Sequence, residues 1–107
     1  MKDDKIYLIH IIECIEWIES YTKLGKGEFI NTKLIQDGVI RNLEVMGEAT
    51  KRASNETRKK HKEVPWRRIA GLRDVLIHDY FGVDLEIVWN VVEDELPKLK
   101  NQLRKII

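Results

Sequence analysis

Apolar side chains recur every three or four residues along most of this sequence, and this spacing restricts the fold more than any other feature. An amphipathic α-helix buries positions i, i+3, i+4 and i+7. The spacing predicts helices over residues 3–24, from about 32 to 54, over 65–82, and from 84 to near the end of the chain. The expected core positions are Leu8, Ile11, Ile12, Ile15, Ile18, Leu34, Ile35, Val39, Leu43, Met46, Ala49, Ile69, Leu72, Val75, Leu76, Val88, Trp89, Val92, Leu96, Leu99, Leu103 and Ile106. Four such helices predict an all-α fold, an antiparallel four-helix bundle.

Residues that begin and end helices support these boundaries. The stretch Gly25-Lys-Gly27 ends the first helix, residues 28–32 form a connection, and Asn31 or Thr32 is a suitable N-cap for the second helix. Pro65 fits the first position of the third helix, where its missing N–H is harmless. Asp84 is expected to cap the fourth helix after a very short link.

The fourth helix contains Pro97, which is expected to kink it or split it in two because proline cannot donate a backbone hydrogen bond. At 107 residues, the chain is expected to form a single domain, residues 1–107. Its single cysteine, Cys14, rules out an internal disulfide and is interpreted as core filler. No apolar run is long enough to cross a membrane, so a cytoplasmic protein without a membrane partner is expected.

Charge is balanced overall but not locally. A net charge of +1 argues against capture of nucleic acid by bulk electrostatics, so any RNA contact needs a local patch. One local excess of positive charge lies in residues 51–62, with His61, Arg67 and Arg68 nearby; its side chains are those of Lys51, Arg52, Arg58, Lys59, Lys60 and Lys62. The run is either a solvated connection or a rim that follows RNA phosphates. Nearby Trp66 is expected to pack rather than to stack on a base.

Residues 71–84 bring several titratable side chains into one helical run. On an ideal helix, Arg73 and Tyr80 project within about 20° of each other, and Asp74 and His78 form an i, i+4 pair. Arg73 and His78 diverge by about 140°. They can meet only through the reach of the arginine or through a local distortion of the helix.

The pattern Arg73-x-x-x-x-His78-x-Tyr80 resembles the signature of the HepT-like toxins, a branch of the HEPN superfamily of all-helical ribonucleases. The similarity covers most of the chain from about residue 34 onward. Asp74 stands where this branch often has asparagine. Further similar segments are residues 41–49, Pro65-Trp66, residues 69–71, Trp89 and residues 96–99.

The resemblance implies metal-independent cleavage of RNA, and the residue types suit that reaction. Cleavage by 2′-hydroxyl attack needs a proton acceptor, a proton donor and a cation for the phosphate. Arg73 is expected to hold the phosphate and His78 to transfer the proton, with Asp74 orienting His78. Glu48 is interpreted as a brace for the arginine or as a surface carboxylate. No metal or other cofactor is expected.

One histidine per chain does not fill both proton-transfer roles, whereas a two-fold dimer would supply two. The resemblance likewise implies a homodimer with a shared Arg/His cleft. It further implies the toxin of a type VII toxin-antitoxin system that acts on tRNA or mRNA. Its MNT-type nucleotidyltransferase antitoxin would silence the toxin by transferring AMP to Tyr80. The residue alone would also fit an interface aromatic.

A different class of function fits the same residues. The chain could be a non-catalytic dimeric adaptor that binds a nucleotidyltransferase partner or a nucleotide. Arg73 and His78 would then only bind anions. Replacing either residue by alanine separates the two hypotheses, because only a ribonuclease would lose an activity on RNA.

Overall fold

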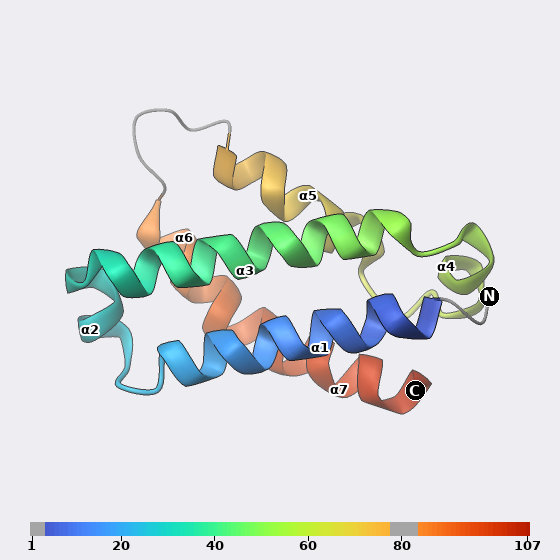
Figure 1. Ribbon diagram of the computed structural model, residues 1–107, viewed down its shortest axis with the longest axis horizontal. Coiled ribbons are helices and arrows are strands. Elements are labelled where there is room, and N and C mark those ends of the chain that lie inside the picture. The colour runs from blue at the N-terminus through green and yellow to red at the C-terminus, as the bar shows by residue number, and fades with distance from the viewer. Residues whose placement is uncertain (1–3, 78–83) are drawn as a thin grey trace.

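The computed structural model describes residues 4–77 and 84–107, and for residues 73–77 it describes the backbone alone. These residues form α1 (Asp4–Tyr21), α2 (Lys26–Asn31), α3 (Lys33–Arg52), α4 (Asn55–Lys60), α5 (Trp66–Ile77), α6 (Leu85–Asn90), the π-helical turn η1 (Val91–Glu95) and α7 (Leu96–Ile106). Helix α1 runs antiparallel to α3, which packs on α5, and α7 packs behind α1 (Figure 1). The all-α class and the bundle of four main helices are confirmed. Within the described ranges, no helix is both long and apolar enough to span a membrane.

The core is built from the apolar stripes that the helical spacing predicts. Ile11, Ile15 and Ile18 on α1 are completely buried, as are Val39, Leu43 and Met46 on α3. The prediction for Leu34 was wrong, because its side chain is 81% exposed. Leu34 lies in the first turn of α3, where it borders an open apolar pocket instead of a neighbouring helix.

Two short helices occupy segments that the sequence pattern assigned to connections. Helix α2 replaces most of the expected connection at residues 28–32. It begins after Gly25, whose φ of 96° suits glycine, and it is anchored by the fully buried Phe29, whose ring centroid lies 5.5 Å from that of Trp89. Helix α4 lies inside the basic stretch, and the Ser54 side chain caps its N-terminus by accepting from the Thr57 N–H.

The last helical run is split close to Pro97, as expected. Asp84 caps α6 by accepting from two backbone N–H groups, which confirms its predicted role. The break itself is the π-helical turn before the proline, in which the Leu96 N–H donates to the Val91 carbonyl five residues earlier. Because Pro97 offers no N–H, a wider turn ahead of it is a low-cost arrangement. The predicted end of the third helix, near residues 81–82, lies outside the described residues.

The buried carboxylate of Asp4 ties the start of α1 to the junction of α3 and α4. Its Oδ2 accepts hydrogen bonds from the Ser54 Oγ at 2.6 Å, the Ser54 N–H at 3.0 Å and the Thr57 Oγ1 at 2.5 Å. These donors, the two hydroxyls foremost, lower the pKa of Asp4 below its usual value. The basic helix α4 is therefore held in place by a charged group from the N-terminal end of the sequence, 50 residues before Ser54.

We expect Asp4→Ala to lower the melting temperature by about 5 °C or more at pH 7, because three hydrogen bonds to a carboxylate are lost. A depressed pKa stabilises the fold above the unfolded-state pKa, and this contribution disappears as the pH falls through the folded-state pKa. The difference between wild type and variant should therefore shrink as the pH is lowered below about 4. Thermal melts from pH 7 to pH 3 measure it.

Asp37→Ala is the matched control, because Asp37 pairs with Lys33 only on the exposed surface of α3. It should change the melting temperature little at any pH. An equal, pH-independent loss in both variants would contradict the role given to Asp4.

Candidate functional site

Helix α5 carries the first half of the titratable run, and its predicted core face is buried as far as the described side chains extend, which leaves out Val75 and Leu76. Ile69 and Leu72 are buried, and α5 packs along α3. Arg73 and Asp74 are backbone positions within α5. His78 and Tyr80 lie outside the described residues, so the meeting of the four side chains stays a prediction.

Trp66, at the start of α5, belongs to the core. Its side chain is 8% exposed, and its indole Nε1 donates to the His61 carbonyl at 2.9 Å. The expectation that Trp66 packs rather than stacks on a base is confirmed. The same hydrogen bond fixes the α4 to α5 connection against the first turn of α5.

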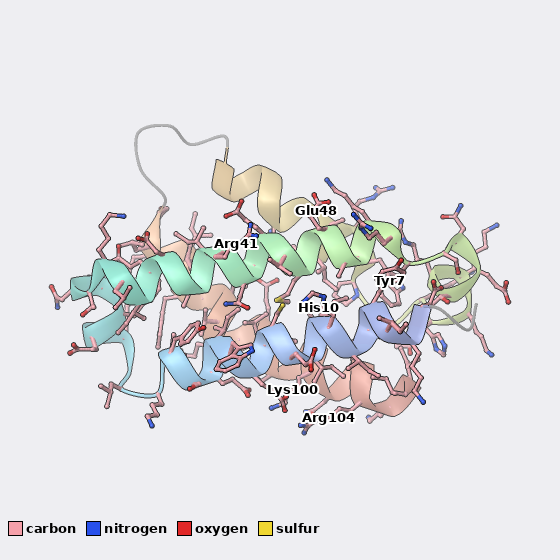
Figure 2. The ribbon with its side chains drawn as sticks, in the orientation of Figure 1. Tyr7, His10, Arg41, Glu48, Lys100 and Arg104 are labelled. Atoms are coloured by element: carbon pink, nitrogen blue, oxygen red, sulfur yellow. The ribbon has the colours of Figure 1, made fainter. Side chains whose placement is uncertain are left out.

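Glu48 lies on α3, the helix against which α5 packs. It is exposed and borders a shallow groove of about 260 Å³, together with Arg41, Glu44 and Val45. Arg41 and Glu48 are about two turns apart along α3, and both are labelled on this helix in Figure 2. The position suits a group that faces the polar surface of the bundle, while its proposed contact with Arg73 stays a prediction.

The predicted RNA-binding side chains fall into two groups. Lys51 and Arg52 lie in the last turn of α3, and Lys59 and Lys60 in the last turn of α4; all four are exposed. Cations at these positions interact favourably with the helix dipole, so part of the basic run also stabilises helix ends. Arg58 and Lys62 form the second group, which borders a groove at the α4 to α5 junction.

Arg58 is held in a fixed orientation in that groove. Its Nη2 donates to the Thr50 carbonyl at 2.6 Å, and its Nε is buried without a hydrogen-bond acceptor among the described residues. No described carboxylate forms an ion pair with Arg58. Among the described residues, its positive charge is therefore held in place without a carboxylate partner.

The groove also contains Arg67 and Arg68, which the predicted RNA-binding set leaves out. It has a volume of about 800 Å³ and is lined by Arg58, Lys62, Val64, Pro65, Trp66, Arg67, Arg68 and Ala70. Their position in the sequence could have indicated this groove. Both arginines lie in the first turn of a helix, where the helix dipole disfavours cations. Arg68 forms two hydrogen bonds with Glu95, which raise its pKa and join α5 to η1.

Cys14 is confirmed as a core residue. It is buried on α1, and burial, with a smaller effect of Glu13, raises the pKa of its thiol to about 11. A thiol with this pKa is almost fully protonated near neutral pH, so it is a poor nucleophile there.

Comparison with known protein families shows which family this helical chain belongs to. The model of the family described as HepT-like, "Ribonuclease HepT-like", matches residues 11–106. The chain belongs to the HepT-like ribonuclease family. The expected membership of this family is thereby confirmed, whereas the roles of Arg73, His78 and Tyr80 stay predictions.

Relatives with curated names agree with the HepT-like assignment. The chain is 50% identical to a "Gamma-glutamylcyclotransferase and putative RNase" of Methanocaldococcus jannaschii, matching 99% of this chain but only 48% of the relative. It is 41% identical to a "Putative RNase" of Caldanaerobacter subterraneus subsp. tengcongensis, over 100% of this chain and 96% of the relative. It is 42% identical to the "Probable ribonuclease HepT" of Thermococcus cleftensis, over 98% of this chain and 96% of the relative. No solved structure matches the chain.

This HepT-like chain thus spans nearly the whole of two relatives and about half of the third. All three names include ribonuclease activity, whereas only the longer one adds a second activity.

Proposed function

We propose that this chain is the toxin of a type VII toxin-antitoxin system, a metal-independent endoribonuclease that acts on tRNA or mRNA. The observation that carries the proposal is the match of the HepT-like ribonuclease family across residues 11–106, which includes the Arg73-x-x-x-x-His78 pattern. Helix α5 packs on α3 through its buried apolar side chains. This packing would hold the residues of the pattern on a rigid helix, as a catalytic site requires.

Each residue of the pattern is given one chemical role. Arg73 stays protonated at all physiological pH values and presents a planar fork to the scissile phosphate. His78 removes or returns the proton, since imidazole titrates near neutral pH. Asp74 orients His78 from the previous turn, and Glu48 on the adjacent helix α3 braces Arg73. Cleavage follows when the 2′-hydroxyl oxygen attacks the phosphorus and the 5′-oxygen of the next nucleotide leaves with a proton.

The active form is proposed to be a homodimer, in which two copies of Arg73 and His78 share one cleft. An uncovered apolar surface on α1 and α3 supports association with a second copy. Trp17 is 57% exposed and stacks on Tyr21 with ring centroids 6.0 Å apart. Tyr21 also borders an apolar pocket of about 620 Å³ with Leu34 and Gly38. Apolar patches of this kind commonly mark protein interfaces.

An MNT-type nucleotidyltransferase antitoxin is proposed to silence the toxin by adding AMP to Tyr80. The attacking phenolic oxygen of Tyr80 would bond to the α-phosphorus of ATP and release pyrophosphate. The adduct adds negative charge and bulk close in sequence to Arg73 and His78. The exposed basic side chains at the ends of α3 and α4 are proposed to attract the RNA before cleavage.

The proposal is tested by incubating purified wild type with a single-stranded RNA in excess EDTA and analysing the ends of the fragments. We expect cleavage to continue in EDTA and to leave 2′,3′-cyclic phosphates, because the attacking group is the neighbouring 2′-hydroxyl. An RNA carrying 2′-fluoro groups should remain intact. Cleavage that stops in EDTA, or that leaves 3′-hydroxyl ends, would contradict this chemistry.

A further inference from the structure

The groove at the α4 to α5 junction combines fixed and free positive charges. Arg58 is anchored on the Thr50 carbonyl, whereas Lys62 and Arg67 are exposed and form no ion pair with a described residue. Arg68 already forms an ion pair with Glu95, so we treat it as part of the groove lining and not as a free positive charge. Residues 51–68 hold eight basic side chains against Glu56 and Glu63, although the whole chain has a net charge of only +1.

Arg67 stands where a cation lowers helix stability. The first turn of α5 contains no acidic residue, and the positive end of its dipole adds to the charge of Arg67. The same turn therefore attracts anions twice, through its N–H groups and through the guanidinium. An arginine in the first turn does not help to stabilise α5, so its position is not explained by folding. Binding of an anionic ligand would explain it.

The groove is also linked to the candidate catalytic helix. Ala70 lines the groove, and Arg73 follows one turn later on α5. The backbone positions of Arg67 and Arg73 are about 9 Å apart along the helix axis. A polyanion lying in the groove would thus continue toward the Arg73 position.

We propose that this groove, with Arg58, Lys62 and Arg67, holds the phosphodiester backbone of the RNA strand next to the cleavage position. The inference rests on the proposed ribonuclease function. Trp66 borders the groove but is only 8% exposed, so little of its ring is available to stack on a base, and we expect the groove to bind phosphates regardless of sequence. The anchored Arg58 lowers the conformational entropy lost on binding.

The test is fluorescence anisotropy with a labelled single-stranded 2′-fluoro RNA, which cannot be cleaved by 2′-hydroxyl attack. The groove variant Lys62→Gln/Arg67→Gln is compared with Lys23→Gln/Lys98→Gln, which changes net charge equally at exposed residues outside the groove. We expect the groove variant to bind about 10-fold more weakly and the control to bind like wild type. The slope of log Kobs against log salt should fall by about 1.4 in the groove variant, since two phosphate contacts are lost.

Additional binding measurements distinguish a phosphate site from a sequence-specific RNA site and from a site for an acidic protein. The groove variant should lose affinity for oligo-U and for oligo-A by the same factor. A loss that depends strongly on the RNA sequence would overturn the phosphate assignment. Unchanged RNA binding by the groove variant would overturn it too, above all if binding to poly-glutamate is lost, because the groove would then fit an acidic protein. These binding results do not depend on cleavage. If wild type fails to cleave natural RNA while the groove variant still loses binding, the proposed function fails and the groove assignment stands.

Discussion

Alanine at His78 or at Arg73 should reduce the rate of RNA cleavage by about 100-fold or more. Loss of a positioned proton-transfer group costs about 10² to 10⁴ in rate, and loss of a charge that stabilises the transition state costs about 10² to 10³. Because both residues serve one step, the double variant should be little worse than the single variants. Single-turnover cleavage of a labelled RNA by the purified proteins measures these rates.

Two matched controls identify effects that come from charge or surface alone. His10 and Arg104 are exposed, and Glu16 is the one carboxylate among the described residues that pairs with Arg104. Their alanine variants should cleave at the wild-type rate. Arg73→Lys keeps the charge but loses the planar fork, so its rate should lie between wild type and Arg73→Ala. Wild-type rates in Arg73→Ala and His78→Ala, with unchanged melting temperatures, would remove both residues from the mechanism.

Coexpression with an MNT-type nucleotidyltransferase should increase the intact mass of wild type by one or more AMP units and abolish its RNA cleavage. Tyr80→Phe should gain no mass, because it lacks the phenolic oxygen that attacks the α-phosphorus of ATP. On an ideal helix Tyr80 projects within about 20° of Arg73, so the adduct would place a phosphate beside the guanidinium. Intact-mass spectrometry and the cleavage assay on the same samples measure both effects.

Tyr21→Phe is the control for that experiment, since Tyr21 is an exposed tyrosine on α1, far in sequence from Tyr80. It should be modified and inhibited like wild type. An unchanged mass adduct in Tyr80→Phe would place the modification elsewhere. A modified wild type that still cleaves RNA would show that the adduct does not act as an off switch.

The helices and their core were predictable from the sequence because they are long and their apolar stripes are complete. The stripe on α1 is buried at each predicted position, and Asp84 caps α6 as its residue type suggests. Helices α2 and α4 were missed because six residues are too few for a periodic signal. Leu34 was assigned to the core by its spacing, but burial depends on which helices pack beside it.

The site was predictable only in part. The family pattern predicts roles for Arg73, His78 and Tyr80, and these roles stay predictions, because the structure does not describe the side chains of these residues. Arg67 was noted beside the basic run, but the groove was missed because its walls come from α4, the connection and α5 together. The tie from Asp4 to Ser54 was equally hidden, since the two residues are 50 positions apart.

Growth and RNA integrity in cells that produce this chain without an antitoxin most directly test whether Arg73 and His78 make it a ribonuclease rather than a helical adaptor. Wild type, Arg73→Ala and His78→Ala are produced at equal levels, and total RNA is examined over time. We expect growth arrest and RNA loss with wild type alone. Equal growth and intact RNA in all three cultures, with the nucleotidyltransferase partner still bound on coexpression, would contradict the ribonuclease function and favour the adaptor.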